Sequence, residues 1–153
     1  MSHNSDSFET LHGLAVQKMD DRARVVAQTE ANITQSTKQL EMLEQYRLDY
    51  IARLQNRLQE GMSSAQCVNF QKFISTLEEA LGQQRVIIAQ LEKQVEKERE
   101  AWFEARREVN SMQALIDRKK QEQLKIANRQ EQKMNDEFAA RAYLASRRQQ
   151  SGG

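Results

Sequence analysis

Apolar residues recur every seven positions through the second half of the chain. One set (a) reads Ile74, Leu81, Ile88, Val95, Trp102, Val109 and Ile116, and its companion (d) reads Leu77, Gln84, Leu91, Glu98, Ala105, Met112, Lys119 and Ile126. Two such sets with a heptad spacing are typical of a left-handed coiled coil. Three polar residues interrupt the d set, and we interpret them as residues that fix the register at some cost in stability.

A weaker pair of sets runs through the first half. Its a positions are Met19, Val26, Ile33, Leu40, Arg47 and Leu54, and its d positions are Ala15, Arg22, Thr29, Ser36, Leu43 and Tyr50. Between the halves, Gly61 is suited to end a helix because glycine adopts the left-handed conformation without a Cβ penalty. Ser63 or Ser64 is suited to cap the next helix. A connection this short places the two helices side by side and antiparallel.

We therefore predict an all-α fold, a long antiparallel two-helix coiled coil with an overhanging C-terminal helix. The predicted domain covers 8–148, with a helix at 8–58, a turn at 59–67 and a helix at 68–146, and with disorder at 1–7 and 149–153. At 1.5 Å per residue the arms measure about 75 Å and about 115 Å. The C-terminal overhang then has no intramolecular partner. A single helix of that length is marginal in water, so it frays, self-associates or is held by another protein.

The composition argues against an enzyme. Hydrophobic residues make up 39% of the 153 residues, charged residues 29%, and proline is absent. This suits a narrow seam along uninterrupted helices better than a compact core. The histidines, His3 and His12, and the single cysteine, Cys67, do not match any usual metal or nucleophile spacing, and no glycine-rich phosphate loop occurs. We expect no catalytic residue, no metal and no cofactor.

Charge and hydropathy favour a cytoplasmic location. The net charge is +1, but residues 117–148 carry nine basic and five acidic side chains, a local excess of +4. We interpret this segment as a solvated helix face or, less often, as a docking surface for an acidic partner. Interleaved acids disfavour a nucleic-acid or membrane binder. The first residues lack a signal-peptide pattern, a free thiol suits a reducing compartment, and the longest apolar run, 86–89, is far below the roughly 20 residues that span a bilayer.

Aromatic side chains gather beside or outside the a and d sets near the predicted turn. They are Tyr46, Phe70 and Phe73. Two interpretations stay open: these side chains thicken the seam, or they form an exposed patch for a partner, since aromatic residues dominate binding hot spots. Phe103 and Tyr143 are interpreted as packing residues.

Several segments resemble the FliJ family of the flagellar type III export apparatus. They are QLEMLEQY at 39–46 followed by Tyr50, NFQKFISTLE at 69–78, the opening 11–21, and QKMNDEFA at 132–139. The resemblance spans nearly the whole chain. It implies a helical hairpin similar to the coiled-coil gamma-subunit stalk of rotary ATP synthases, at the flagellar base on the cytoplasmic side of the inner membrane. Any membrane association would be peripheral and through protein partners.

The resemblance also implies partners and residues. Family proteins bind the export ATPase hexamer, the cytoplasmic domain of the membrane export gate, and flagellar export chaperones. Carried over by position, the gate and chaperone surface comprises Gln39, Leu43, Tyr46, Tyr50, Phe73, Leu77, Ala80 and Gln84. Position 84 is His in the close family pattern, so Gln84 puts a pH-sensitive contact there in doubt.

The overhang suggests a second contact. We expect it to enter the ATPase ring, where acidic channel residues could meet Arg118, Lys119, Lys120, Lys125 and Arg129. The alternative is a self-associating structural spacer without a role in export.

Overall fold

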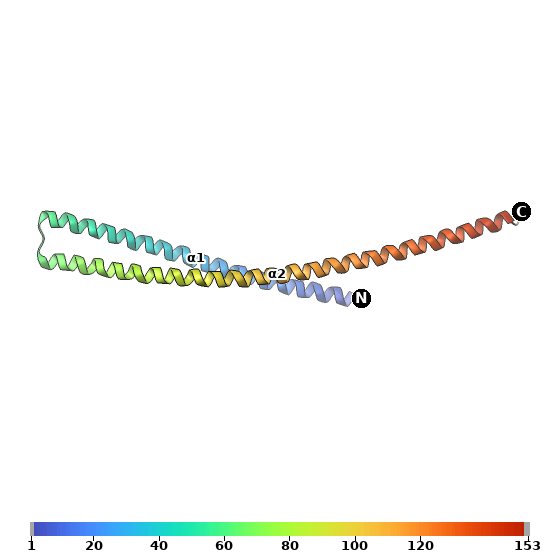
Figure 1. Cartoon of the computed structure of the whole chain (residues 1–153), viewed down its shortest axis with the longest axis horizontal. Coiled ribbons are helices and arrows are strands. Elements are labelled where there is room, and N and C mark those ends of the chain that lie inside the picture. The colour runs from blue at the N-terminus through green and yellow to red at the C-terminus, as the bar shows by residue number, and fades with distance from the viewer. Residues whose placement is uncertain (1, 152–153) are drawn as a thin grey trace. The chain divides into compact units, whose positions relative to one another are not determined.

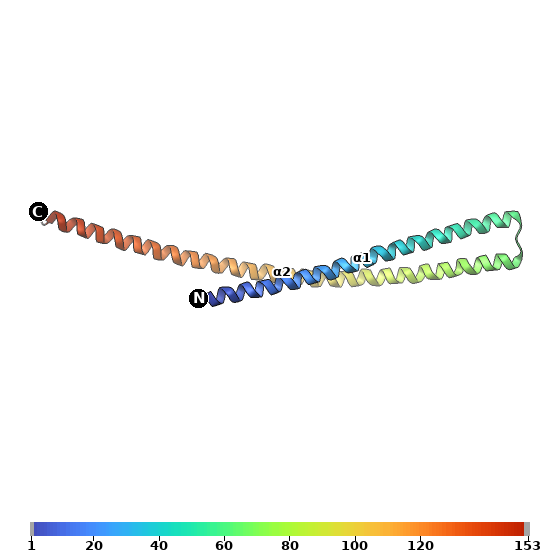
Figure 2. The ribbon, with the colours of Figure 1, turned by 180° about the vertical axis from the view of Figure 1, so that it is seen from behind.

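A computed structural model describes residues 2–151, with side chains described from Asp6. It contains two helices, α1 (Ser2–Glu60) and α2 (Ser64–Ser151), which Figures 1 and 2 show from opposite sides. Two compact units are distinguished. One unit is Gln17–Arg106. The other consists of the start of α1, up to Val16, together with α2 from Arg107 onward. The prediction of an all-α helical hairpin is confirmed.

The turn between the helices is shorter than the predicted 59–67. Gly61 has a φ of 95°, the left-handed conformation expected of a glycine that ends a helix. Ser63 caps α2, because its Oγ accepts a hydrogen bond from the Gln66 amide at 3.2 Å and its carbonyl oxygen accepts one from the Cys67 amide at 3.0 Å. The flanking residues, Gln59 and Ala65 among them, are good helix formers, and the helices therefore continue up to these caps.

The outer helix ends also differ from the prediction. The first helix begins at Ser2 instead of residue 8, and the second ends at Ser151 instead of residue 146. No proline interrupts either end, and Thr10 Oγ1 and Ser151 Oγ bond back to the carbonyls of Asp6 and Arg148. The expected disorder at residue 1 and at 152–153 concerns positions outside the described residues.

In the unit Gln17–Arg106, the predicted seam holds the helices together. Its most buried apolar members are Leu81, 1% exposed, Val95, 3%, and Ala105, 3%. The weak first-half set is also correct: Met19, Val26 and Ile33 are half-buried, and Thr29 is buried. Arg22 is the exception, since it is exposed at a predicted d position. A long charged side chain readily keeps its guanidinium in water from such a site.

In the other unit, the start of α1 lies against α2. Ala15 and Ile116 are buried, at 5% and 8% exposed, and the Lys119 ammonium lies 4.6 Å from the centre of the Phe8 ring. Every described residue from 121 onward is exposed, including Ile126, which was predicted for the seam. The predicted overhang is thus present. The d set was predicted to continue to Ile126, but Lys119 is its last member in contact with α1, because α1 supplies no residues opposite Ile126.

Candidate partner-binding surfaces

The eight residues assigned to the gate and chaperone surface occupy d positions and the neighbouring g positions of both helices. Each g residue directly precedes an a residue; the g members are Gln39, Tyr46, Phe73 and Ala80, and the d members are Leu43, Tyr50, Leu77 and Gln84. In an antiparallel pair, the g positions of the two helices face one another on one side of the seam. The eight residues therefore share one flank of the hairpin, which we call the g flank.

Hydrogen bonds join the two helices on this flank. Gln84 Nε2 donates to the Ser36 carbonyl oxygen at 3.0 Å and to Gln39 Oε1 at 3.2 Å. The side-chain amide of Gln84, a polar residue in the d set, thereby finds its hydrogen-bond partners within the hairpin. It ties residue 84 to residues 36 and 39, so it fixes the register as the heptad pattern predicted.

Aromatic rings continue the g flank toward the turn. The ring centres of Tyr50 and Phe73 lie 4.3 Å apart, and those of Tyr50 and Phe70 lie 5.9 Å apart. Arg53 and Arg57 lie over the Tyr50 and Phe70 rings at 5.5 and 5.6 Å, within the range of cation–π attraction.

The aromatic residues near the turn differ in exposure. Phe70 is half-buried, as expected of a side chain that thickens the seam, and its neighbour Tyr50 is half-buried in the seam itself. Phe73 and Tyr46 are 43% and 51% exposed. The g flank therefore carries exposed aromatic side chains whose positions are fixed by packing against the seam.

The opposite flank carries charge. Here e positions face e positions, and ion pairs join Glu44 to Arg85 at 3.1 Å and Glu30 to Arg99 at 2.9 Å. Arg99 also pairs with Glu96 at 2.7 Å. Hydrogen bonds to Glu30 and then to Glu96 raise the pKa of Arg99 above its ordinary value. We call this side the e flank.

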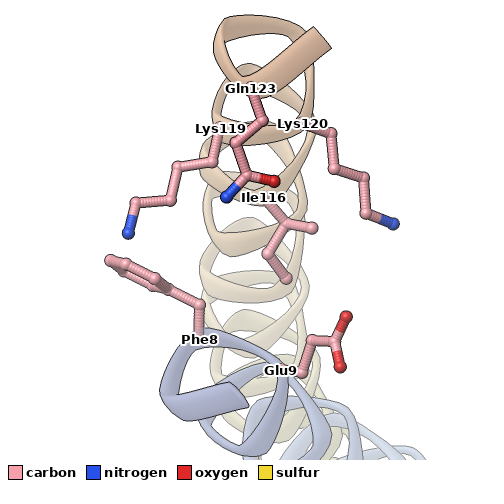
Figure 3. A pocket seen from close by; sticks show the side chains of 6 residues that line it. All are labelled: Phe8, Glu9, Ile116, Lys119, Lys120 and Gln123. Atoms are coloured by element: carbon pink, nitrogen blue, oxygen red, sulfur yellow. The ribbon is translucent and has the colours of Figure 1, made fainter. Parts of the chain in front are cut away.

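The basic residues proposed for the ATPase contact lie in the unit that contains the overhang. Lys119 and Lys120 line a hollow of about 150 Å³ together with Phe8, Glu9, Ile116 and Gln123 (Figure 3). Lys119 extends toward Phe8, whereas Lys120 points to the other side of the helix. Arg118, Lys125 and Arg129 are exposed. The five cations thus share one stretch of α2 but not one face.

Among residues 2–151, no group of three or more His, Cys, Asp or Glu residues is placed to hold a metal ion. In the same part of the chain, neither helix contains a stretch long and apolar enough to cross a membrane.

One surface was missed by the sequence analysis. Phe103 was interpreted as packing, yet it is 48% exposed, and its ring meets Trp102 edge-on with centres 5.0 Å apart. Trp102 was assigned to the seam and is half-buried there. The signal in the sequence that could have revealed this surface is Ala23, a small residue at an e position that lies next to the large Trp102 at an a position.

The fold and its two exposed flanks define a coiled-coil hairpin protein of the all-α class. The profile of the flagellar FliJ protein family matches residues 4–148. The chain is 35% identical to the flagellar FliJ protein of Salmonella typhi and 34% identical to that of Escherichia coli strain K12. Each match covers 138 residues, 90% of this chain and 94% of the relative. No solved structure matches the chain significantly. The chain belongs to the flagellar FliJ family.

Proposed function

We propose that this protein is a non-catalytic component of the flagellar type III export apparatus. In this proposal the unit containing the overhang binds the export ATPase hexamer as a central stalk. The g flank contacts the export gate and export chaperones. Membership of the flagellar FliJ family supports the flagellar role.

The observation that carries the stalk proposal is the unpartnered end of α2. All described residues from 121 to 151 are exposed, and they include Leu124, Met134, Phe138 and Tyr143, each at least 62% exposed. A single helix gains most of its stability from packing an apolar face. A narrow channel that surrounds this segment would supply that packing, and acidic channel residues would complement its local charge excess.

The g flank supports the second part of the proposal. Exposed aromatic side chains held by a packed seam resemble binding hot spots, because their conformational entropy is already restricted before binding. Tyr46 and Phe73 meet this description, being 51% and 43% exposed. Tyr50 holds Phe73 in place by ring contact.

The test separates the two surfaces. Purified protein is mixed with the export ATPase of the same organism, and ATP hydrolysis and hexameric rings are followed by kinetics and electron microscopy. Truncation after Gln123 removes only exposed residues and is expected to abolish stimulation while leaving gate binding intact. Conversely, Tyr46→Ala with Phe73→Ala is expected to weaken gate or chaperone binding and spare ATPase stimulation.

Loss of both activities in either variant contradicts this division of labour. Absence of any effect on the ATPase, together with a stable dimer by light scattering in which truncation after Gln123 restores the monomer, would instead support the structural spacer.

A further inference from the structure

The e flank of the unit Gln17–Arg106 carries ion pairs at some layers and not at others: Thr37 faces Glu92, and Ala23 faces Arg106. Glu30 on α1 pairs with Arg99 on α2. One heptad toward the N-terminus of α1 and one toward the C-terminus of α2, the same geometry places Ala23 opposite Arg106. Alanine has no carboxylate to offer. Within the described residues Arg106 has no ion pair, and its guanidinium lies over the Trp102 ring at 5.5 Å.

The missing side chain leaves a groove. Its volume is about 290 Å³, and it is lined by Ala23, Val26, Glu30, Arg99, Trp102 and Phe103. Most of the lining side chains are apolar, and the paired Glu30 and Arg99 side chains line it as well. This volume lies just below the range of about 300–1,000 Å³ typical of pockets for drug-sized ligands. The groove therefore suits one or two side chains of a protein better than a cofactor.

The residues around the groove have the composition of an interface. Trp and Arg are the residue types most enriched at hot spots, and a polar rim around an apolar centre is the usual anatomy of a protein interface. Trp102 and Phe103 are fixed against each other, so a partner would meet a preformed aromatic surface. Two nearby cations differ in their pairing: Arg99, which lines the groove, pairs with Glu30 and Glu96, whereas Arg106, which lies over the Trp102 ring beside the groove, has no ion pair among the described residues.

We propose that this groove is a docking site for an amphipathic α-helix of another protein. The partner helix presents an aliphatic or aromatic side chain to Trp102, Val26 and Ala23. About one turn along, it presents a carboxylate to Arg106. The site lies on the e flank, opposite the g flank, and it is independent of the proposed gate, chaperone and ATPase contacts.

The decisive variant is Ala23→Glu. It places a carboxylate opposite Arg106, in the same relation as Glu30 to Arg99, and its longer side chain fills the groove. We expect the hairpin to keep its thermal midpoint, while the docking site is closed. This substitution separates binding from folding, because it adds an ion pair between the two helices while it closes the groove.

The probe is a synthetic helical peptide with leucines at i, i+4 and i+7 and glutamates beside this stripe. Its binding is followed through the fluorescence of Trp102, the single tryptophan of the chain. A saturable blue shift is expected with the full-length protein. Ala23→Glu and Phe103→Ala should each weaken binding by about tenfold or more, the loss typical of a hot-spot residue.

A charge exchange provides the matched control. Arg106→Glu should weaken binding of the glutamate peptide and strengthen binding of the same peptide with lysine in place of glutamate. Circular dichroism checks that each variant stays helical. Equal binding of both peptides to wild type and Arg106→Glu, binding unaffected by Ala23→Glu, or no saturable binding to the folded protein would each overturn the proposal. Sedimentation that shows a dimer lost in Ala23→Glu would instead assign the groove to a second copy.

Discussion

Leu81→Ala should destabilise the hairpin more than any substitution in the overhang. Leu81 is 1% exposed and is the largest fully buried side chain among the described residues. Replacing a buried leucine with alanine costs about 2–5 kcal/mol, depending on how far the surroundings collapse. A two-helix seam has solvent close by on both flanks and relaxes more easily than a globular core. We therefore expect about 2–3 kcal/mol, the lower part of that range.

Urea unfolding followed by far-UV circular dichroism measures this loss, and Leu124→Ala is the matched control. Leu124 is 62% exposed and lies in the segment without an intramolecular partner. The same chemical change there should move the free energy of unfolding by less than about 0.5 kcal/mol, as for most surface substitutions. Equal destabilisation by both variants would refute the assignment of the seam as the source of stability. It would also show that the overhang packs in solution.

Other substitutions test the turn and the polar seam residues. Gly61→Ala should cost about 1 kcal/mol, because φ is 95° there, and should lower the thermal midpoint. Gln84→Ala should cost about 1 kcal/mol in urea unfolding, because the hydrogen bonds to Ser36 and Gln39 disappear. Glu98→Leu should stabilise by about 1 kcal/mol, because Glu98 Oε2 is buried without a hydrogen-bond partner. A lower urea midpoint for Glu98→Leu would contradict that reasoning.

The heptad pattern predicted the seam because burial in a two-helix coiled coil follows a single period. Leu81, Val95, Ala105 and Ile116 are all buried where the pattern placed them. Even Thr29, a polar residue at a predicted d position, is 3% exposed. At Thr29 the period therefore decided burial more strongly than the polarity of the residue did, whereas the long charged side chain of Arg22 stays exposed at its d position.

Helix ends and flanks were harder to predict because they depend on local caps and on pairs across the seam. The turn was predicted too long: Ser63 or Ser64 was expected to cap the second helix, and α2 begins directly after the Ser63 cap instead of at residue 68. To predict which contacts fall on which flank, one needs the register of one helix against the other. Gln39 and Gln84 are far apart in the sequence; the family resemblance assigned them to one surface, and their cross-helix hydrogen bond gives the contact between them.

The two flanks explain how a hairpin with so thin a core can present distinct surfaces. On the g flank, amide and aromatic contacts leave Phe73 and Tyr46 exposed. On the e flank, the Glu44–Arg85 and Glu30–Arg99 pairs join the helices, and the layer between them sets Thr37 opposite Glu92 with no ion pair between the two. The change from Glu30 to Ala23, one heptad apart at the same position, combines such an unpaired layer with an apolar groove: the fold retains its seam, and Arg106 beside the groove has no ion pair among the described residues.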